Sequence, residues 1–394
     1  MTTPPIYLDH AATTPVRPEV LEAMTPFFTA RFGNPSSVHR FGREARVALD
    51  EARERVARCL GASVDEVVFT SCGTESDNLA MIGAWRAQRR KGRSAIVTTP
   101  IEHKAVLAVA HHLAGEGAAE RLLAVDASGT VDAAAYDAAL GDDVALVSVM
   151  WVNNEMGVVQ DVPSLAERAR AAGAVFHTDA VQAFGKVAID ARTQPFDLLA
   201  LSGHKIGAPK GIGALYVRRG TSIEPLMHGG AQDRGLRPGT ENVAMAVGLA
   251  IAAELAVAER EGESRRLGDL RARLEREILA RVPDAVVHGA GAATRAPHIV
   301  NLSVPGTDSE SMLMALDLQG IAASAGSACQ SGSVTASHVL TAIGVRPDLA
   351  VAAVRLSLGH ETTEADVARA AEVFSTLANK ARGIAPARDM ATVA

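Results

Sequence analysis

Residues 198–218 read LLALSGHKIGAPKGIGALYVR and contain two apolar runs joined by a turn. The first run, Leu198–Ser202, and the second, Ala214–Arg218, have the length and composition of buried strands. Lys205 stands directly after the first of them. A lysine at such a position either pairs with a carboxylate or serves as a reactive amine. The amine role needs the neutral form, which burial and nearby positive charge favour because they lower the amine pKa.

Five similar runs precede this stretch. We expect strands at Val67–Thr70, Ala95–Thr99, Leu122–Asp126, Val144–Met150 and Val175–Asp179. Helical patterns accompany them, for example Glu44–Leu60, which ends at Gly61, and Val162–Ala172, which ends at Gly173. Strands that alternate with helices predict an α/β fold with a seven-stranded, mostly parallel sheet covered on both faces.

The pattern changes after residue 241. Asn242–Arg281 predicts one long helix, whose later part places four apolar residues on one stripe, Leu267, Leu270, Leu274 and Ile278. Shorter elements follow: strands at Ile299–Val304 and Val354–Leu358, and helices at Ser309–Leu318 and Glu364–Lys380. We therefore expect a smaller α+β domain made of residues 1–15 and 260–394. Residues 16–259 would form the larger domain that carries the sheet.

Composition narrows the function classes. The 394 residues carry a net charge of -6, which argues against a chain-wide nucleic-acid surface. The three cysteines are far apart and lack CxxC spacing, so neither a disulfide framework nor a structural zinc site is expected. We predict no bound metal. No apolar stretch is long enough for a membrane span, and the first residues do not resemble a signal peptide, so we expect a cytoplasmic protein.

Polar residues follow the carboxyl ends of five predicted strands. The sets are Thr70–Glu75, Glu102–Lys104, Asn153–Glu155, Asp179 with Gln182, and Ser202–Lys205. Ligands of open α/β sheets bind at this edge, so the pattern already locates a site.

The sets also suggest a cofactor. The turn at Gly73–Thr74 can hold a phosphate at a helix N-terminus, although Thr74 and Asp77 can equally form a capping box. Asp179 can keep an aromatic ring nitrogen protonated. An amine at Lys205, this carboxylate and a phosphate turn together describe pyridoxal phosphate.

The sequence resembles the cysteine desulfurases of the NifS/IscS type over almost its whole length. The motifs that carry the resemblance are YLDHAATTP (7–15), FGNPSS (32–37), TSCGTESDN (70–78), EHKAV (102–106), VNNEMGVVQD (152–161), HTDAVQ (177–182), SGHKIGAPKGIGALYVRR (202–219), MHGGAQDRGLRPGT (227–240) and SAGSACQSGS (324–333). The resemblance implies the fold-type I architecture of pyridoxal-phosphate-dependent transferases and a homodimer. It also implies L-cysteine as substrate and a sulfur-acceptor protein as partner.

The resemblance assigns roles by position. Lys205 would bind pyridoxal 5′-phosphate as a Schiff base, Asp179 would pair with the ring nitrogen, and His103 would stack on the ring and move protons. Other residues would hold the cofactor: Gly73, Thr74, Asn154, Gln182, Ser202, His204 and, from the neighbouring subunit, Thr240. Asn34, Asn154 and Arg355 would bind the substrate, Arg355 by a bidentate contact to its carboxylate.

Cys329 would be the nucleophile that takes sulfur from cysteine as a persulfide and leaves alanine. The small residues around it restrain the backbone little, which suits a thiol that must reach the cofactor and then an acceptor. Without the resemblance, a spare cysteine is an equal interpretation. The pattern around Cys329 resembles the group with the longer loop.

Three positions and the C-terminal tail depart from the family pattern. Cys72 stands where a small residue is usual, Pro238 replaces a common serine, Gln330 follows Cys329, and the tail after Arg382 is short. Because of this short tail, the sequence does not identify the sulfur acceptor. Iron–sulfur cluster assembly is the default pathway, and tRNA, DNA or cofactor thiolation are the alternatives. Rival functions on the same cofactor are selenocysteine cleavage, β-elimination and aminotransfer, which need Lys205 but not Cys329. A non-catalytic partner protein with this fold is a further alternative.

Overall fold

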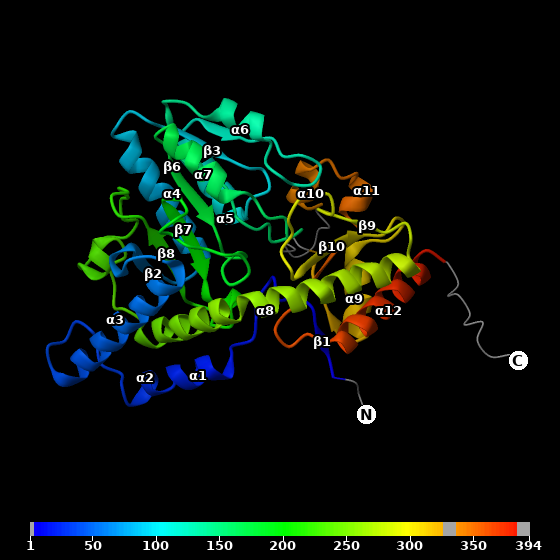
Figure 1. The fold of residues 1–394 in the computed structure, drawn as a ribbon, viewed down its shortest axis with the longest axis horizontal. Coiled ribbons are helices and arrows are strands. Elements are labelled where there is room, and N and C mark those ends of the chain that lie inside the picture. The colour runs from blue at the N-terminus through cyan, green and yellow to red at the C-terminus, as the bar shows by residue number, and fades with distance from the viewer. Residues whose placement is uncertain (1–3, 326–335, 384–394) are drawn as a thin grey trace, which may run out of the picture.

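The computed structural model describes residues 4–325 and 336–383. Figure 1 shows two lobes, with helix α8 (Val243–Arg281) running along both of them. In the described residues no helix has the length and apolar character that crossing a membrane requires.

The larger lobe is built on one seven-stranded sheet of the described residues, in the order β2-β8-β7-β6-β5-β3-β4. Its strands are β2 (Val67–Thr70), β3 (Ala95–Thr98), β4 (Glu120–Leu122), β5 (Val144–Ser148), β6 (Val175–Asp179), β7 (Leu198–Ser202) and β8 (Gly213–Val217). Strand β8 is antiparallel to β2 and β7, and the other pairs are parallel. The predicted α/β class and mostly parallel sheet are confirmed.

Both faces of the sheet are buried, which explains why its strands read as continuous apolar runs. On one face Val67, Phe69 and Phe176 pack with helices α3, α7 and α8, and on the other Val68 and Val175 pack with α4 and α5. The helices of this lobe are α1 (Pro18–Met24), α2 (Pro26–Thr29), α3 (Arg40–Leu60), α4 (Gly73–Arg89), α5 (Lys104–Gly115), α6 (Ala133–Ala139) and α7 (Val162–Ala171), with short 3₁₀ turns η1 (Val64–Glu66), η2 (Gly203–Lys205) and η3 (Gln232–Gly235).

One strand prediction was wrong. The structure places β4 at Glu120–Leu122, whereas the sequence pattern favoured Leu122–Asp126. Strand β4 is the edge of the sheet and, among the described strands, pairs only with β3, so its side chains are less buried and Leu122 is exposed. The apolar pattern of a half-covered edge strand is weak, and the backbone pairing with β3 sets the register instead.

The smaller lobe has its own core. Its elements are β1 (Ile6–Tyr7), β9 (Val286–Val287), β10 (Ile299–Ser303), α9 (Ser309–Leu318), β11 (Ile321–Ala322), α10 (His338–Ala342), α11 (Pro347–Ala350), β12 (Ala353–Ser357) and α12 (Glu364–Ala381). The predicted stripe of α8, from Leu267 to Ile278, is buried here together with Ile6 and Leu8, whereas Ala246–Ala253 of the same helix lie in the core of the sheet. A domain boundary near residue 260 stays a proposal.

Candidate active site

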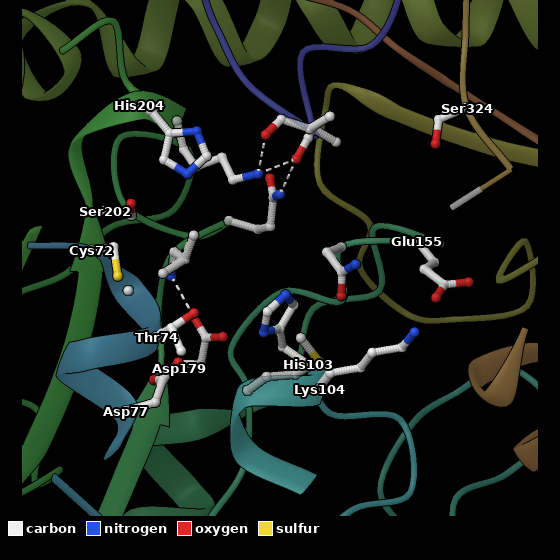
Figure 2. A pocket seen from close by; sticks show the side chains of 18 of the residues that line it. Cys72, Thr74, Asp77, His103, Lys104, Glu155, Asp179, Ser202, His204 and Ser324 are labelled. Atoms are coloured by element: carbon white, nitrogen blue, oxygen red, sulfur yellow. Dashed lines mark hydrogen bonds between the residues drawn. The ribbon is translucent and has the colours of Figure 1, made fainter. Parts of the chain in front are cut away.

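A cavity of ≈ 390 Å³ lies where the carboxyl ends of the central strands face the smaller lobe. Ten of the predicted site residues line it: Gly73, Thr74, His103, Asn154, Asp179, Gln182, Ser202, His204, Lys205 and Arg355. Ala11, Ala12, Ser324 and His338 are among the other residues of its wall. The strand ends, the N-terminal segment and the smaller lobe therefore build one site, part of which Figure 2 shows.

Lys205 reaches the cavity from the 3₁₀ turn η2, which directly follows β7. Its amine donates hydrogen bonds to Ala11 O at 2.5 Å and Ala12 O at 2.7 Å. Burial lowers the pKa of Lys205 to about 8, and the positive charge of Arg355 acts in the same direction. The amine is therefore available in its neutral form at mildly alkaline pH, as the sequence analysis required.

Asp179 ends β6 and projects a buried carboxyl into the cavity. One oxygen accepts the Val181 N–H at 2.8 Å. Burial raises the pKa of Asp179, while His103 and Lys205 oppose the rise. Such a carboxyl can pair with a positively charged ring nitrogen. This ion pair would compensate for the hydration that the carboxylate loses on burial.

His103 faces Asp179 across the cavity (Figure 2). Its Nδ1 accepts the Ala105 N–H at 3.1 Å, which caps helix α5. Loss of hydration lowers the pKa of His103, Asp179 opposes this shift, and Lys205 adds to it. Since Nδ1 is an acceptor, Nε2 is the ring atom that can exchange protons with a ligand.

The start of helix α4 provides a place for a phosphate. Its N-cap is Cys72, whose side chain makes no capping hydrogen bond, so the first N–H groups are open to a ligand. A Cβ on Gly73 would lie 2.8 Å from Val181 Cγ2. Ser202 Oγ is buried and has no hydrogen-bond partner within the described part of the chain. His204 faces the same region (Figure 2), and burial lowers its pKa to about 4.

The capping-box interpretation of Thr74 and Asp77 is wrong. Thr74 lies inside the first turn of α4, and the Asp77 carboxyl is buried against β6 and does not turn back onto the helix N-terminus. Glu75 instead accepts the Ser71 N–H at 2.7 Å, and Arg237 pairs with its other oxygen at 2.9 Å.

Arg355 approaches the cavity from β12 in the smaller lobe. Its Nη1 donates to Asn154 O at 2.8 Å and its Nη2 to Asp9 Oδ1 at 2.9 Å. Gln182 also lines the cavity, where its amide donates to Ala11 O at 2.8 Å. The loop after β5, the N-terminal segment and the smaller lobe thus meet around Arg355.

Three predicted residues do not line this cavity. Asn34 is exposed just before α3, and Thr240 lines a separate hollow with Arg237 and Asp233. Cys329 lies outside the described residues. Its sequence neighbour Ser324 does line the cavity and pairs with the backbone of Arg355.

Several residues of the cavity wall were assigned no catalytic or binding role from the sequence. Asp77, Lys104, Glu155 and His338 line it as well. Asp77 and Glu155 stood inside quoted motifs, so their place beside the strand ends was a usable signal. One oxygen or nitrogen atom from each of Asp77, His103 and Asp179 lies within 4.8 Å of the other two. Two carboxyls and one imidazole are therefore close together in the cavity.

Residues 6–370 match the aminotransferase class-V family, so the chain belongs to that family. Among curated relatives, the cysteine desulfurase NifS of Azotobacter vinelandii is 46% identical over 382 residues, which cover 97% of this chain and 94% of the relative. The cysteine desulfurase IscS of Dictyoglomus turgidum is 45% identical over 381 residues, covering 97% and 96%. Within the class-V family, the chain is thus a member of the NifS/IscS cysteine desulfurases, and the resemblance is confirmed.

A solved structure described as a NifS-like protein superposes with a TM-score of 0.88 at 35% identity. The match covers 95% of this chain and 99% of that one. This confirms the fold that the resemblance implied.

Proposed function

We propose that the chain binds pyridoxal 5′-phosphate on Lys205, converts L-cysteine to L-alanine and carries the sulfur as a persulfide on Cys329. Membership of the cysteine desulfurase family supports the overall activity. The observation that carries the assignment is the convergence of the Lys205 amine, the Asp179 carboxyl and the open start of α4 in one cavity.

The residues present fit the cofactor. Ser202 Oγ, buried without a partner in the described chain, and the open N–H groups of α4 suit a phosphate. Gly73 has no space for a side chain there. The Asp179 carboxyl suits a protonated ring nitrogen, and the amine of Lys205 suits the aldehyde. When bound, this cofactor supplies an electron sink for the bonds around the substrate α-carbon.

Three side chains of the site would transfer protons or supply charge during the reaction. Lys205 Nζ, with a pKa of about 8, takes the substrate α-proton in its neutral form. His103 Nε2 would hold or return a proton, while Nδ1 stays fixed by the Ala105 N–H. Asp179 would supply the negative charge that pairs with the ring nitrogen.

The substrate carboxylate would meet Arg355, which Asp9 and Asn154 orient. A solved structure described as SspA in complex with cysteine is 35% identical and has a TM-score of 0.78, covering 90% of this chain and 98% of that one. This relative supports cysteine as the ligand of the present cavity.

The sulfur step balances without a redox partner. The Cys329 thiolate attacks the substrate sulfur, an S–S bond forms, and the Cβ–S bond breaks with its electron pair going to the carbon. A proton then completes the methyl group of alanine. An acceptor protein, by default an iron–sulfur scaffold, would remove the persulfide sulfur.

A homodimer would cover an exposed apolar surface of this chain and would bring Thr240 to the active site of the neighbouring subunit. Large apolar side chains are exposed along α1, α2 and the start of α3, among them Leu21, Phe28, Phe32, Val38 and Phe41. Exposed apolar side chains in such number favour a protein partner. Asn34 lies in this segment. Thr240 lies away from the cavity of its own chain, which is expected of a residue that contacts the cofactor of a neighbouring subunit.

The three cysteines allow a matched experiment. Cys329→Ser should retain the visible absorbance of bound cofactor and lose sulfide release from cysteine in the presence of reductant. Cys59→Ser is the control, because Cys59 is partly buried in α3, away from the cavity, and burial raises its pKa to about 11. Lys205→Ala should lose covalently held cofactor and activity together.

Sulfide release that persists in Cys329→Ser would favour the lyase alternatives, including selenocysteine cleavage. A wild-type protein that binds no pyridoxal phosphate would favour the non-catalytic alternative.

A further inference from the structure

Asp77 is a buried carboxyl that the proposed chemistry does not use. It lies in the second turn of α4, lines the cavity and is 1% exposed. Its Oδ1 has no hydrogen-bond partner among the described residues, and the described chain gives it no lysine or arginine ion pair. An ionised carboxylate in such surroundings is costly, so its protonation state needs an explanation.

The nearest imidazole does not supply a compensating charge. His177 Nε2 lies 3.5 Å from Asp77 Oδ1, and its Nδ1 lies 2.9 Å from Ser148 Oγ. His177 is fully buried on β6, and burial lowers its pKa to about 3. His177 Nε2 likewise has no hydrogen-bond partner among the described residues, and a neutral ring brings Asp77 no charge that would offset its ionisation.

The second carboxyl of this region is Asp179. Asp77 and Asp179 each contribute an atom to the group that lies within 4.8 Å, and two buried carboxyls at this distance resist joint ionisation. The titratable groups that face Asp77 are Asp179 and His177 from β6, Glu102 and His103 from the loop after β3, and Cys72 at the start of α4. Figure 2 shows Asp77 beside Asp179, with His103 on the far side.

The two carboxyls differ in what stabilises a negative charge. Asp179 accepts the Val181 N–H at 2.8 Å and feels the positive charge of Lys205. Asp77 has neither, and burial with the nearby Asp179 raises its pKa well above the ordinary range. A single negative charge shared by the pair therefore belongs on Asp179.

We infer that Asp77 is a positioning residue: it keeps its proton, so that Asp179 alone carries the negative charge that faces the ring nitrogen. This inference rests on the proposed function for its purpose. The protonated state of Asp77 itself belongs to the protein alone and can be tested without cofactor.

The first test is the unfolding of cofactor-free protein across pH. A carboxyl whose folded pKa is raised stabilises the native state at low pH and loses that contribution as pH rises through the folded pKa. Asp77→Asn removes this loss, so the folding equilibrium constant of the variant relative to wild type should rise about tenfold per pH unit from about pH 4 up to the raised folded pKa of Asp77, and level off above it. Asp137→Asn, which removes an exposed carboxyl on α6 that pairs with Arg168, is the control and should change the ratio far less, because exposed ion pairs contribute little to stability.

The second test uses the holoenzyme and asks where the charge goes without Asp179. In Asp179→Asn, burial still opposes ionisation of Asp77, but the repulsion by Asp179 is gone, so Asp77 can partly take over the charge. We therefore compare the effect of Asp77→Asn on pyridoxal phosphate affinity in the Asp179→Asn variant and in wild-type protein. Because neighbouring groups are coupled, the loss of affinity should be roughly tenfold larger in the Asp179→Asn variant.

Parallel pH profiles of wild type and Asp77→Asn in the first test would overturn the inference, since Asp77 would then be ionised in the native state. Equal losses in both backgrounds of the second test would overturn its link to Asp179. Asp77→Ser, also neutral and a hydrogen-bond donor, replaces Asp77→Asn if the latter does not fold. If the first test succeeds and no cofactor binds, the proposed function fails and the protonation of Asp77 stands.

Discussion

The guanidinium of Arg355 donates to Asp9 Oδ1 over 2.9 Å. The residue expected to bind a substrate carboxylate is therefore held by a carboxylate of the chain's own N-terminal segment. A second N–H of the fork reaches Asn154 O at 2.8 Å, and Arg355 is only 3% exposed. Both contacts use the planar, forked geometry of arginine, so the orientation of the remaining N–H groups is set before a substrate enters.

Arg355→Lys should therefore raise KM for cysteine far more than it lowers kcat. A lysine keeps the charge but cannot reach Asp9, Asn154 and a substrate carboxylate together. A charged hydrogen bond is worth about 1.5–3 kcal/mol, so KM should rise roughly 10- to 150-fold. Steady-state kinetics would measure this, with Arg346→Lys, an exposed arginine on the surface, as control. A drop confined to kcat would contradict substrate binding by Arg355.

The attachment of pyridoxal phosphate to cofactor-free protein should follow the pKa of Lys205. Only the neutral amine attacks the aldehyde, and burial together with Arg355 lowers this pKa to about 8. The rate should rise about tenfold per pH unit below pH 8 and level off above it. Absorbance after rapid mixing measures the rate.

Arg355→Gln should move that plateau to higher pH, because it removes a positive charge that lowers the pKa of Lys205. A rate that keeps rising up to pH 10 in wild-type protein would show an ordinary lysine and would contradict the cavity electrostatics.

Gly73→Ala should weaken the binding of pyridoxal 5′-phosphate about tenfold and leave the binding of unphosphorylated pyridoxal little changed. The added methyl group would lie 2.8 Å from Val181 Cγ2 and 3.5 Å from Ser202 Cβ, which disturbs the start of α4 where the phosphate would sit. Gly115→Ala at the end of α5, where a Cβ meets nothing within 4 Å, is the matched control. Equal loss for both ligands would place the phosphate elsewhere.

Ser337→Ala should destabilise the protein more at pH 8 than at pH 5. Ser337 Oγ caps α10 through Val339 N and Leu340 N and also donates to Glu155 Oε2 at 2.5 Å. Burial raises the pKa of Glu155 and the Ser337 hydrogen bond opposes the rise, so the variant leaves a carboxyl that is harder to ionise. Loss of the cap costs about 1 kcal/mol at any pH, and the carboxylate left without this donor adds about 1–2 kcal/mol only as pH rises past the raised native pKa of Glu155.

The double variant Glu155→Gln with Ser337→Ala should lose the pH dependence and keep the cost of the cap, as read from denaturant unfolding. A cost for Ser337→Ala that stays constant between pH 5 and pH 8 would mean that Glu155 is ionised independently of Ser337.

Local sequence determined the central strands because both faces of the sheet are buried. Val175–Asp179 and Leu198–Ser202 lie where the apolar runs predicted them, since a strand covered on both sides must be apolar throughout. The same argument failed at the edge strand β4, where half of the surface is open and register depends on one neighbour. Asp179 and Lys205 were predictable as site residues because Asp179 ends such a strand and Lys205 lies in the turn that directly follows one.

The sequence by itself determined the class of fold, the family and the side chains that end the strands, because periodicity and motif order are local properties of the chain. Only the tertiary structure decided that Asp77 turns toward Asp179 and away from its helix cap, and that Asp9 meets Arg355 across 346 residues of chain. Such pairs depend on which elements pack together, and burial then sets their charge. The sequence determines which ionisable groups are present. Burial and neighbouring charges in the folded structure determine which of these groups are protonated.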